Sequence, residues 1–195
     1  KYPSMSFVNS KSVFHDKVIV LSYDSYHVFS ILQSTIHEEW AKKYSSTLGG
    51  LNNINYSPNE CLETYPFPKN ISRTDEAQLN EKGVTYHSYR KNVMHNLNLG
   101  LTKTYNLFHS SAIATHSQNG KDKQVAALQK HLENTPITIS LNEAIQDIIK
   151  LRELHVQLDG AVLDAYGWND IEHVSYTHLT LPTSDLVEIW VVAVA

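Results

Sequence analysis

The feature that most constrains the fold is a stripe of mostly apolar side chains between Ser140 and Gly167. A stripe of this kind covers one face of a long helix, which must pack on another helix to leave water. Ser140 followed by Glu143 forms a capping box that starts the helix, and Gly167 is a typical C-terminal stop. The stripe advances in alternating steps of four and three residues through Ala144, Ile148, Leu151, His155, Leu158, Val162 and Ala165.

A second long helix is predicted after Thr74 or Asp75, where the sequence resembles a capping box, and it should run towards Gly100. A shorter helix is predicted over Gln124–Glu133, whereas Leu101–Asp122 has no periodicity and is expected to be irregular. The face of the second long helix that should pack inwards is only partly apolar and comprises Val84, His87, Lys91, Met94 and Leu97 or Asn98.

The N-terminal part has a different pattern. Ser6–Val8 and Val13–Ser22 are rich in Val, Ile and aromatic residues, which favours strands. A helix should follow, capped by Asp24 or Ser25, because apolar residues recur at helical spacing from Phe29 to Trp40. Leu51–Asn70 carries Asn, Ser and three prolines and is expected to be a surface loop. The predicted fold class is α+β, with a small β portion followed by a mostly α-helical region, in an incomplete fragment of a larger protein.

Composition excludes some classes of function. The net charge is −4 with His neutral, which is not that of a basic nucleic-acid-binding domain. One cysteine cannot form an internal disulfide and fits a reducing, cytoplasmic location. The chain starts at Lys1 without a signal-peptide pattern, and the apolar stretch Leu186–Ala195 is too short to span a bilayer. We therefore expect no membrane contact and a chain that is cut at its N-terminal end.

Eleven histidines raise the question of a metal site. His37 has no second His four residues on, so the H-E-x-x-H zinc motif is not formed. His87 and His95 lie about two helical turns apart, and His155 belongs to the apolar stripe, where a core or interface role is expected. Cys61 has no nucleophile signature around it and is expected to be half-buried in a loop. The sequence also lacks the glycine-rich loops that hold cofactors, so we predict no catalytic, cofactor-binding or metal-binding residues in this chain.

Basic residues come in small groups, namely Lys42-Lys43, Arg90-Lys91, and Lys121 with Lys123. Hydroxyl and amide side chains follow the first group, and such groups hydrogen-bond to phosphates and base edges. The plain alternative is a solvated helix end. The candidate DNA-binding residues are Lys42, Lys43, Ser45, Ser46, Asn53 and Tyr56.

Four phrases, in this order, resemble the C-terminal region of large single-chain adenine-specific DNA methyltransferases. Those enzymes belong to bacterial restriction–modification and phage-defence systems and include the type IIG and MmeI-like enzymes. The resemblance spans about Phe7 to Ile171, with a looser insert around Ser111–Ser140. The phrases are VFSILQSTIHEEWAKKYSSTLGG, NYSPNECLETYPFP, GLTKTYNLFH and LRELHVQLDGAVLDAYGWNDI.

The resemblance implies a division of labour. In that family an upstream domain binds S-adenosylmethionine and orients the flipped adenine with an N-P-P-[YF] motif, which this chain lacks. A separate module must hold the duplex while the base is flipped out. Residues 1–70 are then the end of a target-recognition domain and residues 71–173 a C-terminal helical region, joined in cis to the methyltransferase domain and acting on double-stranded DNA. The alternative is a helical scaffold that docks other domains or defence partners without touching DNA, and a free-standing metal enzyme or hydrolase stays a minor third reading.

The last segment has another resemblance. VSYTHLTLPT, which starts at Val174, is what a transposase-based sequencing-library adapter encodes when it is translated in frame. We therefore interpret Val174–Ala195 as an artefact of DNA sequencing and assembly rather than as natural protein. A natural β-strand tail is the alternative, and questions about function are best asked of residues 1–173.

Overall fold

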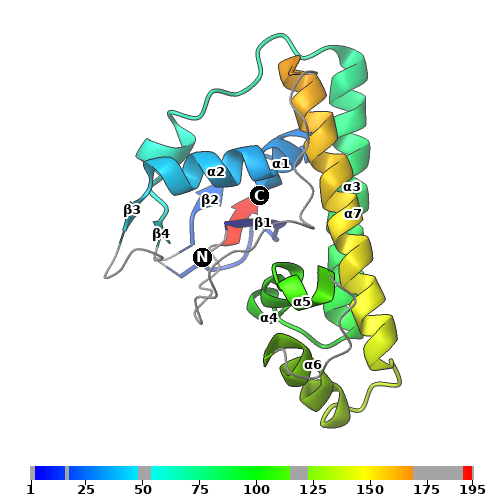
Figure 1. The fold of residues 1–195 in the computed structure, drawn as a ribbon. Helices are drawn as coiled ribbons and strands as arrows, with labels where there is room; N and C mark the ends of the chain where they lie inside the picture. The colour runs from blue at the N-terminus through cyan, green and yellow to red at the C-terminus, as the bar shows by residue number, and fades with distance from the viewer. Residues whose placement is uncertain (1–2, 16–17, 48–53, 115–122, 169–190, 195) are drawn as a thin grey trace.

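The computed structural model describes residues 3–15, 18–47, 54–114, 123–168 and 191–194 (Figure 1). Most of these residues are helical, and a small strand portion comes first along the chain, so the predicted α+β class is confirmed. Two long helices, α3 (Arg73–Asn96) and α7 (Leu141–Tyr166), run antiparallel along one side of the molecule. Their mutual packing is the most extensive contact between any two elements.

The helix α7 has the predicted ends and the predicted buried face. Ser140 Oγ accepts from the Glu143 N–H and the Glu143 carboxylate accepts from the Ser140 N–H, which completes the capping box. Gly167 adopts the left-handed conformation at φ 70°, which glycine reaches without steric cost. The stripe is buried at Ala144, Ile148, Leu151, His155, Leu158 and Val162, and Ala165 is partly buried.

The helix α3 begins earlier than predicted and buries a different face. Ser72 is its N-cap, and its Oγ accepts from the Asp75 N–H at 3.1 Å. Val84, which the apolar pattern turned inwards, is 43% exposed, and Lys91 is exposed. The prediction of the buried face was wrong because that face contains Gly83 and Arg90, and a search for periodic apolar residues does not include glycine or arginine. The buried residues are Leu79, Gly83, Tyr86, Arg90, Val93 and Leu97.

The helix predicted from Asp24 or Ser25 onwards is two helices, α1 (Tyr26–Gln33) and α2 (Thr35–Tyr44). Ser34 separates them with an extended backbone at φ −68° and ψ 157°. Its hydroxyl donates to Ile31 O at 2.7 Å and accepts from the His37 N–H. Because Ser is a good N-cap, Ser34 both ends α1 and starts α2, and the chain changes direction there.

The strands differ from the predicted bounds, because β1 begins two residues before the predicted Ser6–Val8 and β2 is much shorter than the predicted Val13–Ser22. β1 (Ser4–Phe7) and β2 (Val20–Leu21) each pair in parallel with β5 (Val191–Val194), in the order β1-β5-β2. The predicted strand Val13–Ser22 is therefore confined to its end, and Val13 is 99% exposed. Its β-branched side chains favour extended backbone, but propensity without a pairing partner does not make a strand. β5 is the described part of the segment that resembles adapter, and the rest of that segment lies outside the described residues.

The remaining elements form two groups, one at the outer end of α2 and one beside the lower part of α3 and α7 in Figure 1. β3 (Ser46–Thr47) and β4 (Ile54–Asn55) form an antiparallel pair, and a π-helical turn, η1 (Pro58–Leu62), follows within the predicted loop. α6 (Lys123–Glu133) confirms the predicted short helix. The prediction that Leu101–Asp122 is irregular was wrong in two places, where α4 (Leu101–Phe108) and α5 (Ser111–Ala114) form.

Three apolar clusters hold these elements, of which the smallest packs Ala41 of α2 against Tyr56 and Cys61, and the other two are larger. The largest lies among α1, α3 and α7 and includes Phe29, Leu79, Leu151 and Leu158. The second joins the C-terminal end of α3 to α4, α6 and the start of α7. Among the described residues, no helix combines the length and apolar character that crossing a bilayer requires.

Candidate nucleic-acid interface and a basic cavity

The predicted DNA-binding residues gather where α2 ends and β3 begins, at the outer end of α2 in Figure 1. Lys43 and Ser46 are exposed there. Lys42 instead lies between two carboxylates, with its Nζ 2.6 Å from Glu38 Oε1 and 2.7 Å from Glu39 Oε1. Burial would lower the pKa of Lys42, but these carboxylates outweigh it and raise the pKa. Lys42 therefore stays charged, and its charge is already balanced within the protein.

Tyr56 and Ser45 lie beneath this surface rather than on it. The Tyr56 side chain is 5% exposed, and its hydroxyl is 3.0 Å from His37 Nε2. His37 Nδ1 is 2.7 Å from Leu32 O, a pure acceptor, so Nδ1 carries the proton and Nε2 accepts from Tyr56. Burial lowers the pKa of His37 to about 4, so the ring is neutral near pH 7. Ser45 Oγ contacts Cys61 Sγ at 3.2 Å.

An aromatic side chain accompanies the exposed polar groups. The Tyr44 ring is 41% exposed and lies on Trp40 with 4.2 Å between ring centroids. Lys43 Nζ is 5.4 Å from the Tyr44 ring centroid, within cation–π range. On the adjoining strand pair, Asn55 Nδ2 donates to Ser46 Oγ at 3.2 Å. We name Lys43, Tyr44, Ser46 and Asn55 the α2–hairpin surface.

This surface differs in part from the predicted set. Lys43 and Ser46 belong to both, whereas Asn53 lies outside the described residues. Tyr44 and Asn55 were not among the predicted site residues. The sequence does contain a signal for Tyr44, because Trp40 precedes it by four residues and side chains at that spacing meet on one helix face.

A basic cavity of about 240 Å³ lies between β1, α3 and α4. Arg90 is its most buried cation, only 2% exposed. Its Nη1 donates to Ser4 Oγ at 3.1 Å, Gln33 Oε1 at 3.1 Å and Tyr105 OH at 2.8 Å, and its Nη2 donates to Met5 O. All four acceptors are neutral. The residues that line the cavity are Ser6, Phe7, His87, Arg90, Lys91, Met94 and Leu101.

His87 reports the electrostatic character of this cavity. Burial lowers its pKa to about 4, and the positive charges of Arg90 and Lys91 act in the same direction. Its ring also contacts Phe7 at 5.4 Å and Tyr26 at 5.9 Å between centroids. His87 was predicted to face inwards and is half-buried. The wall of the cavity therefore carries positive charge, and the histidine in that wall is neutral near pH 7.

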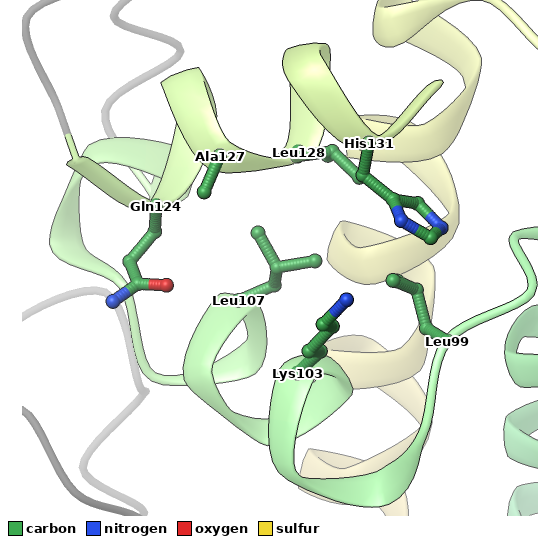
Figure 2. Close-up of a pocket in the computed structure, with 7 residues that line it drawn as sticks. All are labelled: Leu99, Lys103, Leu107, Gln124, Ala127, Leu128 and His131. Atoms are coloured by element: carbon green, nitrogen blue, oxygen red, sulfur yellow. The ribbon is translucent and has the colours of Figure 1, made fainter. Parts of the chain in front are cut away.

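A smaller cavity of about 60 Å³ lies between α4 and α6 (Figure 2). The figure shows Lys103, Gln124 and His131 arranged around the apolar Leu107. His131 Nε2 is 2.9 Å from Leu97 O, so this ring joins α6 to the end of α3. The volume suits water rather than a ligand of ordinary size, and we assign it a packing role.

Two further polar groups proposed from the sequence are structural in this fold. His155 Nε2 lies 3.6 Å from Asp159 Oδ1, both side chains being 2% exposed. Asp159 accepts from the Thr35 N–H at 2.8 Å and from the Thr35 hydroxyl at 2.6 Å. Cys61, expected to be half-buried, is fully buried. Within the part of the chain that the structure describes, no three His, Cys, Asp or Glu side chains are placed to hold a metal ion.

The four phrases that carry the family resemblance touch one another. They supply α1 with α2, the segment around η1, α4, and the C-terminal half of α7. Hydrogen bonds between phrases join Thr35 to Asp159, Tyr56 to His37, Arg152 to Leu107 O and Phe108 O, and Tyr166 OH to Pro66 O.

Comparisons of the chain with protein-family models, with curated proteins and with solved structures find no match.

Proposed function

We propose that this chain is the C-terminal part of a bacterial DNA methyltransferase of a restriction–modification or phage-defence system. It contributes target recognition and domain bracing, and further domains in cis carry the S-adenosylmethionine-dependent methylation of adenine. The observation that carries the proposal is the order of four family-like phrases from Val28 to Ile171. A cytoplasmic location, where such an enzyme meets DNA, is part of the same proposal.

The packing of the phrases supports this reading. Segments that resemble a family by chance need not meet in space, but these four are joined by direct hydrogen bonds. Asp159 of the last phrase holds the backbone N–H and the hydroxyl of Thr35 in the first. Arg152 holds the carbonyls at the end of the third phrase. The four phrases thus lie within one structural unit, as segments of one domain should.

The α2–hairpin surface is the proposed DNA contact. Lys43 is exposed and forms no ion pair with a described residue, so it can neutralise a phosphate. The Tyr44 ring offers a flat, half-exposed face, and the hydroxyl of Ser46 and the amide of Asn55 can hydrogen-bond to phosphate or base edges. Tyr56 supports this surface from below through His37. Lys42 contributes little because Glu38 and Glu39 already bind it.

The test is the affinity of the chain for duplex DNA across a series of salt concentrations, measured by fluorescence anisotropy. Each phosphate contact contributes about −0.9 to the slope of log affinity against log salt, so Lys43→Ala should flatten the slope by about 1. The matched control is Lys150→Ala, an exposed lysine of α7 paired with Glu153, which should leave the slope unchanged. Equal slopes for both variants would refute DNA contact at this surface.

A second candidate function is a helical scaffold that docks other domains or defence partners without touching DNA. The balanced charge of Lys42 and the net charge of −4 favour it. An unchanged DNA affinity in Lys43→Ala would select this candidate. In either case the chain alone should not transfer methyl groups from S-adenosylmethionine to DNA. Detected transfer would overturn both, whereas an N-P-P-[YF] motif in the reading frame before Lys1 would support the methyltransferase assignment.

A further inference from the structure

The cavity between β1, α3 and α4 has a charge arrangement that the proposed DNA surface does not explain. Arg90 is buried, and its guanidinium donates only to neutral oxygens. Buried cations are ordinarily paired with an anion, because leaving water is costly for a charge. Among the described residues, no carboxylate lies close enough to the Arg90 guanidinium to form an ion pair. The positive charge of this side chain is therefore available to the cavity that it lines.

Lys91 adds a second positive charge to the same wall. It follows Arg90 on α3, is exposed, and has no ion pair with a described residue. Its ammonium can therefore reach an occupant directly, whereas Arg90 is fixed by its hydrogen bonds and acts mainly through its charge. The flexible lysine stem allows this reach.

The remaining lining residues suit an oxyanion. Ser6 offers a hydroxyl and His87 a ring nitrogen, and both can donate to oxygen. Phe7, Met94 and Leu101 supply apolar walls, which exclude water and strengthen charge interactions. The volume of about 240 Å³ lies below that typical of drug-sized ligands. We propose that this cavity is a binding site for a phosphate group, with Lys91 in direct contact, Arg90 supplying charge from beneath, and Ser6 and His87 donating hydrogen bonds.

A phosphate fits this set better than a carboxylate does. Two positive charges match a dianion, and two neutral donors, Ser6 on β1 and His87 on α3, match a tetrahedral group with several oxygens. A carboxylate would use a planar pair of oxygens and one charge. The site stands apart from the α2–hairpin surface and does not depend on the proposed function, because it uses β1, α3 and α4 rather than α2 and the β3–β4 pair.

Inorganic phosphate is the probe, added to the full chain while the His87 ring signals are followed by NMR and heat is followed by titration calorimetry. Phosphate should shift the His87 signals saturably and raise the pKa of His87, because a bound anion offsets the charges that depress it. Arg90 and Lys91 of α3 are the charged groups at the ring, and Tyr26 of α1 is the other titratable group in contact with it. Chloride and acetate at equal ionic strength should shift the His87 signals much less.

Variants of Lys91 make the site falsifiable without disturbing the fold. Lys91→Met should weaken phosphate binding by about tenfold, and Lys91→Arg should restore most of it, since a charge-assisted hydrogen bond is lost and then regained. Lys103→Met, at the smaller cavity, is the matched control and should bind as the unaltered chain does. Arg90 is unsuitable as the first variant because it also ties β1 to α3.

Two results would overturn the proposal: no saturable shift of His87 at tens of millimolar phosphate, or equal phosphate affinity in Lys91→Met and the unaltered chain. Where binding is found, a short DNA duplex identifies its source. Displacement of inorganic phosphate from His87 by the duplex assigns the site to a backbone phosphate. Retention of inorganic phosphate in the presence of the duplex assigns it to a free phosphate or nucleotide.

Discussion

Replacing Gly83 with alanine tests the packing of α1 on α3 at its closest point. A Cβ built on Gly83 would lie 2.5 Å from Ser30 Oγ and 2.7 Å from the backbone oxygen of Tyr26. The serine cannot simply rotate away, because its hydroxyl donates to Leu79 O at 2.7 Å. The Tyr26 oxygen can move only with α1 itself. The substitution therefore requires a helix shift and not a side-chain adjustment.

The expected magnitude follows from two opposing effects. Overpacking in a filled core costs about 1–3 kcal/mol, and contact with backbone places Gly83→Ala near the upper end. Alanine regains about 1 kcal/mol of helix propensity over glycine. We therefore expect the free energy of unfolding of Gly83→Ala to fall by about 2 kcal/mol, measured by urea denaturation followed by circular dichroism.

Gly160 provides the matched control on α7. A Cβ there meets nothing within 4 Å, so Gly160→Ala should raise the free energy of unfolding by about 0.5–1 kcal/mol through propensity alone. The comparison removes uncertainty about propensity, because both glycines lie inside helices. A Gly83→Ala variant as stable as Gly160→Ala would show that α1 does not pack on α3 as described.

Three further predictions concern stability. Burial depresses the pKa of His37 to about 4. The neutral ring therefore contributes its full stability to the fold above pH 6.5, and about 3 kcal/mol of the free energy of unfolding should be lost as the pH falls from 6.5 to 4. His37→Gln should flatten the dependence of the melting temperature on pH in this window. Arg152 donates to Leu107 O, Phe108 O and Ser110 O. Arg152→Met should therefore cost about 3 kcal/mol in urea denaturation because three buried hydrogen bonds from a charged donor are lost, and a cost below about 1 kcal/mol would contradict this role. Removal of residues 174–195 should leave the helical circular dichroism and the packing of α3 on α7 unchanged, and loss of cooperative unfolding in the truncated chain would contradict that.

The helix α7 could be predicted from the sequence because local and global signals agree there. Its capping box, its apolar stripe and its terminal glycine all indicate the same boundaries, and tertiary packing had nothing to override. The helix α3 differs, because its inward face depends on Gly83 and Arg90. A glycine becomes interior only when another helix approaches closely, and an arginine only when partners from distant segments receive its N–H groups. Neither condition can be read from periodicity along one helix.

The break at Ser34 shows a related limit. The apolar spacing from Phe29 to Trp40 continues through Ser34 as if one helix were present. Serine caps helices well, but whether it interrupts a helix depends on which other contacts stabilise the break. Here Asp159, from the far end of the chain, holds Thr35 through its N–H and its hydroxyl. A contact across so many residues decides the local geometry, and it becomes visible only in the folded chain.

The sequence indicated where the candidate DNA residues lie, but not which contacts their side chains make. Of the Lys, Ser, Asn and Tyr side chains at the end of α2 and beyond it that the sequence singled out, Lys43 and Ser46 are exposed. The sequence spacing of Glu38 and Lys42 permits an ion pair, but only the structure shows that the Glu38 carboxylate forms it and balances the Lys42 charge. The sequence also could not reveal that Tyr56 turns inwards, because its partner His37 belongs to another segment. Side-chain type indicates which bonds are possible, and the fold decides which are made.

The position of β1 connects the basic cavity to the question of the C-terminal segment. β1 pairs with β5, which lies in the segment that resembles adapter sequence. Yet β1 is also fixed to the helices by side chains, since Gln33 Oε1 accepts from the Met5 N–H at 2.9 Å and Arg90 donates to Met5 O. These bonds use atoms of residues before 174 only. The wall that Ser6 and Phe7 give to the cavity therefore rests on α1 and α3, and the phosphate proposal holds whether β5 is native or not.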